Sequence, residues 1–69
     1  MFLCDLPSGV ITPARPVKVK LEDGRVYDEV SKIMINHCRG GVSILTLTSE
    51  EHDMSRNLSS QEEIEIINN

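Results

Sequence analysis

The stretch that decides the fold of this 69-residue chain is VKVKLEDGRV, residues 17–26. Its first half alternates strictly, with Val17, Val19 and Leu21 on one side and lysines on the other, which predicts a half-buried β-strand. Asp23-Gly24 then predicts a hairpin turn, because glycine adopts the positive φ that a tight turn requires. The chain is therefore expected to form an antiparallel pair of strands that begins at residue 17.

The rest of the chain continues this β pattern. In residues 26–36 the apolar positions change parity, which predicts a β-bulge or a sharp bend near residues 29–32. Residues 42–48 are apolar on both faces and predict a central strand, and residues 64–67 predict a final strand. Between them, the polar residues 49–57 predict an exposed loop, and Ser59–Glu63 match a capping box that predicts one helical turn.

Residues 1–16 differ from the remainder because they contain three prolines, which exclude a helix over most of the segment. We expect an extended N-terminal arm or a short hairpin over residues 1–16, followed by a small β-barrel domain over residues 17–69. The apolar start is too short for a signal peptide, and no apolar run approaches the ~20 residues of a membrane helix. We therefore expect a cytoplasmic protein with no membrane association and with both cysteines reduced.

The order of elements over residues 17–67 resembles that of small SH3-like and Sm-like β-barrels. The hairpin with its bent second strand is similar to the opening of those domains, and residues 58–67 are similar to their closing turn and last strand. The resemblance implies an all-β fold, a five-stranded barrel with one short helical turn before the last strand. The nucleotide-binding signature of the Sm family cannot be mapped onto this chain, so the resemblance does not carry RNA binding with it.

The charge distribution bears on the partners. The chain has 7 Lys and Arg against 11 Asp and Glu, a net charge of −4, and all of the acidic excess lies after residue 48. An acidic chain repels phosphate backbones, which disfavours nucleic acid as a partner. Near the front, a basic stripe of Arg15, Lys18, Lys20 and Arg25 is a weak candidate for anion binding. The alternative is that lysines on an exposed strand prevent aggregation between sheet edges.

Catalytic and metal-binding groups are sparse. Cys4, His37, Cys38 and His52 would suffice for zinc by number, but adjacent residues of a strand point to opposite faces, which separates His37 from Cys38. We expect no metal, no cofactor and no enzymatic activity, because a barrel of this size leaves little room for a substrate cleft. A metal-dependent or thiol-dependent regulator is the most distant interpretation.

Apolar residues on both faces of the third and final strands exceed what one small barrel can enclose. Met34, Leu45, Leu47 and Ile67 are therefore expected on the outside, as a surface that binds a partner. The alternative is that residues 2–11 fold back and cover them. The sequence thus predicts a small non-enzymatic protein-interaction module that self-associates or docks on a larger protein. The alternative function is an Sm-like or SH3-like nucleic-acid-binding accessory protein.

Overall fold

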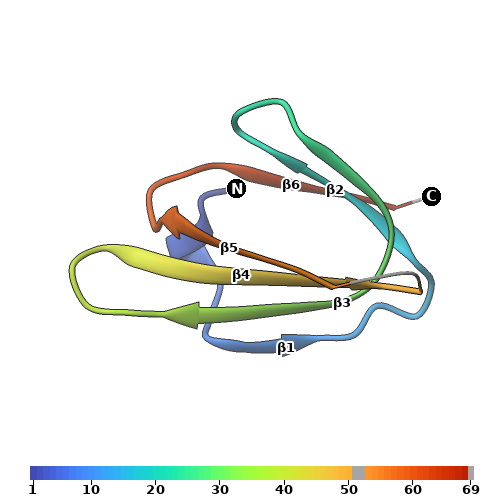
Figure 1. Cartoon of the computed structure of the whole chain (residues 1–69), viewed down its shortest axis with the longest axis horizontal. Coiled ribbons are helices and arrows are strands. Elements are labelled where there is room, and N and C mark those ends of the chain that lie inside the picture. The colour runs from blue at the N-terminus through green and yellow to red at the C-terminus, as the bar shows by residue number, and fades with distance from the viewer. Residues whose placement is uncertain (51–52, 69) are drawn as a thin grey trace.

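The computed structural model describes residues 1–50 and 53–68. It contains a 3-10 helix, η1 (Leu3–Asp5), and six strands (Figure 1). The strands are β1 (Gly9–Ile11), β2 (Val17–Leu21), β3 (Val26–His37), β4 (Val42–Ser49), β5 (Asp53–Ser59) and β6 (Ile64–Asn68). The all-β prediction is confirmed. No helix in the described part of the chain is long and apolar enough to cross a membrane.

The expectation of a closed five-stranded barrel is wrong. All six strands belong to one open antiparallel sheet with the order β5-β4-β3-β2-β6, and β1 pairs with β3 outside this path. The N-terminal segment forms backbone hydrogen bonds with the connection between β5 and β6, the two strands at the ends of this order. Leu3 donates its N–H to the Glu62 carbonyl and Cys4 to the Ser60 carbonyl, both at 2.8 Å. These groups are therefore satisfied without a pairing between β5 and β6.

Strand β3 bends where the parity change predicts it. Its register against β2 shifts between Val17 and Val19, and its register against β4 shifts between Val30 and Lys32. Glu29, at the bend, has a φ of +56°. The first half of β3 consequently pairs with β2, whereas its second half pairs with β1 and β4 (Figure 1). One strand thus takes part in two layers of the fold. Its first half lies in a layer with β2 and β6, and its second half lies in a layer with β1, β4 and β5.

Two sequence expectations about the polar segments are wrong. Residues 53–57 of the predicted loop 49–57 belong to strand β5, because an edge strand buries only one side and Met54 and Leu58 supply apolar groups there. Residues 51–52 of that loop lie outside the described residues. The predicted helical turn before β6 is a simple turn, in which Glu62 donates its N–H to the Ser59 carbonyl at 3.0 Å. The short helix of this protein lies instead at residues 3–5.

The hairpin glycine behaves as expected. Gly24 has a φ of +94°, and the turn is closed by a hydrogen bond from the Gly24 N–H to the Leu21 carbonyl at 3.0 Å. The Asp23 carboxylate accepts a further bond from the Arg25 N–H at 3.0 Å. Such a side chain to backbone bond is typical of a turn that begins with aspartate.

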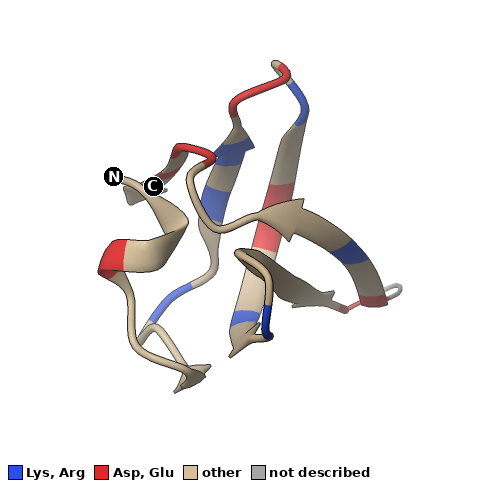
Figure 2. Cartoon of the chain, turned by 90° about the vertical axis from the view of Figure 1, so that its left-hand side faces the viewer, with Lys and Arg blue, Asp and Glu red and all other residues tan. Residues whose placement is uncertain are grey.

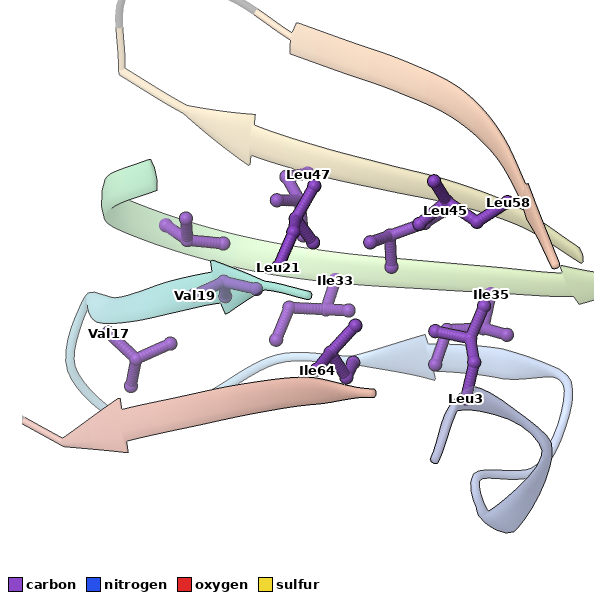
Figure 3. Close-up of a cluster of buried hydrophobic side chains, with 11 residues drawn as sticks. Leu3, Val17, Val19, Leu21, Ile33, Ile35, Leu45, Leu47, Leu58 and Ile64 are labelled. Carbon is purple, nitrogen blue, oxygen red and sulfur yellow. The ribbon is translucent and has the colours of Figure 1, made fainter. Parts of the chain in front are cut away.

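The hydrophobic core lies between the two layers. Figure 3 shows side chains of β2 and β6 pointing toward those of β3 and β4, with Leu3 at one end of the cluster. Leu3 is fully buried although it belongs to the proline-rich N-terminal segment. The buried apolar residues are Leu3, Val17, Val19, Leu21, Val30, Ile33, Ile35, Leu45, Leu47, Leu58 and Ile64.

The N-terminal segment should therefore be needed for stability. We expect Leu3→Ala to lower the free energy of unfolding by about 2–5 kcal/mol, because it leaves a cavity in a small core. The matched control is Phe2→Ala, since the Phe2 side chain is 47% exposed, and it should cost less than about 1 kcal/mol. Urea unfolding followed by circular dichroism measures both. Equal effects of the two changes would show that Leu3 is not part of the core.

Candidate functional site

The outer face of β1, β3 and β4 carries an apolar patch of four residues, Val10, Met34, Val42 and Ile44, here called the outer patch. Val10 lies directly across from Met34 in the sheet, so their side chains share one face. Val10 is 56% exposed, Met34 38% and Val42 39%, whereas Ile44 is half-buried. Of the four residues predicted to contact a partner, Met34 lies in this patch.

Leu45 and Leu47 do not lie on the outside, contrary to expectation. They are 0% and 2% exposed and belong to the core. In β4 the side that holds Leu45 and Leu47 faces the second layer, and the opposite side holds Ile44, Thr46 and Thr48. Their apolar character is explained by burial, and neither belongs to the outer patch.

Ile67 is half-buried, and the structure does not bring it to the outer patch. It lies across from Lys18 on β2 in the register of β2 and β6. Met34 instead pairs with Val10 on one side and Thr46 on the other. The predicted set of four is thus divided among the outer patch, the core and a separate surface of β6.

The predicted basic stripe lies beside carboxylates. Lys18 is 3.6 Å from a carboxylate oxygen of Asp28, and Arg25 is 3.4 Å from one of Asp23. Lys20 lies across the ladder from Glu65. Figure 2 shows the basic segments of β2 next to acidic segments of β3. These neighbours offset the positive charge that an anion would need.

Arg15, the remaining member of the stripe, belongs to the connection between β1 and β2. It lines a shallow hollow together with Pro13, Ala14, Pro16, Val17 and Asn68. The structure therefore does not gather the four basic residues into one cluster.

The cysteines and histidines form no metal cluster within the described residues. Cys4 and Cys38 are free thiols and both are exposed. The His37 ring already uses both nitrogens, with Nε2 at 2.6 Å from the Leu6 carbonyl and Nδ1 at 2.7 Å from the Ser43 hydroxyl. His52 lies outside the described residues.

The hydrogen bonds of His37 belong to a partly buried polar chain that sequence reasoning missed. A carbonyl can only accept, so Nε2 donates to Leu6, and in the neutral imidazole Nδ1 then accepts from the Ser43 hydroxyl. The Ser43 oxygen in turn lies 2.6 Å from the Ser60 hydroxyl, which can donate to it. This series of hydrogen bonds thus joins the N-terminal segment, β3, β4 and the β5–β6 turn.

This polar chain resembles a nucleophile and its base, but its geometry is structural. Ser43 is 0% exposed, so no substrate can reach its hydroxyl. The Ser8 hydroxyl additionally accepts the His37 backbone N–H at 3.1 Å. His37 therefore fixes residues 6–8 against the end of β3. No sequence motif indicates this contact, because its partners are distant in the chain.

Comparison with known proteins identifies no relative from which a role could be transferred: no family model, no curated protein and no solved structure matches the chain.

Removing the Ser43 hydroxyl should destabilise the fold. Ser43→Ala leaves His37 without its donor, and we expect a loss of about 1–3 kcal/mol in the free energy of unfolding. Thr46→Ala, on the same strand, is the control, because its exposed hydroxyl makes a bond of 3.2 Å to Ser55 only at the surface. That change should cost less than about 1 kcal/mol. Chemical denaturation of both variants tests this, and a neutral Ser43→Ala would contradict it.

Proposed function

We propose that this chain is a small non-enzymatic protein-interaction module, which self-associates or docks on a larger protein through the outer patch. The observation that carries the proposal is the exposure of Val10, Met34 and Val42 on one face of the sheet, at 56%, 38% and 39%. Exposed apolar groups that lie together on a sheet are favoured sites of association between proteins.

The surroundings of the outer patch support this use. Met34 lies across from Thr46, and Ile44 lies between Asn36 and Asn57, so these cross-strand neighbours are polar but uncharged, whereas Lys32 lies two residues before Met34 on the same face. Cores of protein interfaces are depleted in charged residues in the same way. Burying one such apolar side chain is worth about 1.5–3 kcal/mol, part of which is lost to the ordering that association requires.

We further propose that the fold is an opened relative of SH3-like and Sm-like barrels. Support comes from the bent β3, which joins two layers, and from the strand order on either side of it. The cytoplasm is the compartment that two free cysteines favour. Nucleic-acid binding is the weaker candidate, because carboxylates lie beside Lys18 and Arg25.

The partly buried polar chain supports the proposal that the protein is non-enzymatic. The Ser43 hydroxyl has no access to solvent, and the ring of His37 is held by Leu6 and Ser43. A general base must reach the proton that it abstracts, and His37 has no free nitrogen for this purpose.

The test is the mass of the protein in solution and its capture of partners. We expect the wild type to form oligomers at micromolar to millimolar concentration in sedimentation equilibrium, or to retain a defined protein from a cell extract. Met34→Glu should abolish either association, because it buries a charge in the contact. Ile67→Glu is the control, since Ile67 lies on a different surface and should leave association unchanged.

A monomeric wild type that captures the same proteins as Met34→Glu would contradict the proposal. Circular dichroism of both variants must match that of the wild type, which separates a lost contact from a lost fold.

A further inference from the structure

A cavity of about 240 Å³ lies between the first half of β3 and the junction of β4 with β5. Its lining includes the apolar side chains of Val30, Leu47 and Met54 together with the ring of Tyr27. Ligand sites for small molecules usually exceed about 300 Å³. This cavity is therefore better matched to one apolar side chain of a partner than to a whole cofactor.

Two unpaired strand edges flank the cavity. The pairing of β4 with β3 begins at Val30, so on the side opposite β2 none of the described strands pairs with residues 26–29 of β3. Strand β5 is the end of the strand order and pairs with β4 alone among the described strands. We call the cavity with these two edges the seam. Unpaired edges offer N–H and C=O groups to an added strand.

The open end of the seam is acidic. Asp28 lines the cavity, and Glu29, Glu50 and Asp53 each follow or precede a lining residue and are exposed. Lys18 offsets Asp28 in part, at 3.6 Å. Figure 2 shows acidic segments on β3 and on either side of the grey trace between β4 and β5.

The other end of the seam is bridged within the chain itself. Arg56 of β5 reaches the carboxylate of Asp23 in the β2–β3 turn at 3.7 Å. The same carboxylate lies 3.4 Å from Arg25, so this end holds two guanidinium groups around one acid. A cationic partner is consequently favoured at the Met54 end of β5 and disfavoured at the Arg56 end.

We propose that the seam binds an extended basic segment of another protein, which lies along β5 and inserts one apolar side chain into the cavity. Main-chain hydrogen bonds to a sheet edge supply affinity in such complexes, and a pocket for one side chain supplies selectivity. The acids at the open end favour lysine or arginine on the side of the inserted residue that lies next to them. This proposal shares with the proposed function only the premise that the chain binds proteins, because the outer patch is a different surface.

Fluorescence anisotropy with designed peptides tests the proposal. The probe is a labelled ten-residue peptide with a single central leucine and with lysine and arginine on one side of the leucine only. We expect it to bind, with an affinity that falls as salt is raised. A peptide with serine in place of the leucine should bind about tenfold more weakly or worse, because it loses the buried side chain.

Variants of the protein distinguish the contribution of the cavity to peptide binding from the contribution of the acidic residues. Met54→Trp should fill the cavity and lower the affinity for the leucine peptide about tenfold or more, while the affinity for the serine peptide changes little. The double change Glu50→Lys and Asp53→Lys should weaken the binding of both peptides. Its matched control is Glu22→Lys with Glu65→Lys, which makes the same change in net charge at a hollow elsewhere on β2 and β6. This control should alter binding by less than about twofold.

Three results would overturn the proposal: no binding of the leucine peptide, equal binding of the leucine and serine peptides, or equal weakening by the two double changes. Met34→Glu should leave peptide binding intact. A protein that binds the peptide but fails to associate through the outer patch would disprove the proposed function alone, and the opposite outcome would disprove the seam alone.

Discussion

The bend of β3 is the constraint on which the rest of the structure depends. Before the bend, Tyr27 faces the interior, and after it Val30, Ile33 and Ile35 do, although a regular strand could not place all four on one side. The register shifts and the positive φ of Glu29 bring about this change of parity. A non-glycine residue at such a φ costs about 1–2 kcal/mol, which the burial of the apolar residues on both sides offsets.

The bend also explains why the N-terminal segment is needed. Two layers that share one strand leave the core open at the ends of the sheet. Leu3 covers one such end, and the hydrogen bonds of His37 with Leu6 and Ser43 hold the segment in place. In a chain of this size the buried area is small, so a contribution from one additional leucine is a substantial part of the stability. The other opening, at the seam, has no such cover among the described residues.

The predictability of the fold follows from the range of the interactions. Strands β2, β3, β4 and β6 could be predicted because their periodicity and the Asp-Gly turn are local, and the bend because parity is local as well. Strand β5 could not, because its polar residues at alternate positions face solvent at an edge, and this pattern also fits a loop. Whether the sheet closes into a barrel, and where Leu3 lies, depend on contacts between residues far apart in sequence, which no local pattern encodes.

The candidate site was predictable to a smaller extent. Met34 has the parity of an outward residue, and the structure places it there, whereas Leu45 and Leu47 required knowledge of the second layer. Val10 and Val42 became members of the outer patch only through the pairing of β1 with β3 and of β4 with β3. The seam arises from the openness of the sheet and has no counterpart in any motif.

Openness of the sheet is the central claim, and amide hydrogen exchange measured by NMR tests it most directly. If β5 and residues 26–29 of β3 are unpaired along the seam, alternate amides of both segments should exchange rapidly, while their neighbours that bond to β4 or β2 remain protected. The interior strand β4 should be protected at every residue that bonds to β3 or β5. Uniform protection of both seam segments in the isolated protein would show a closed barrel and contradict the account.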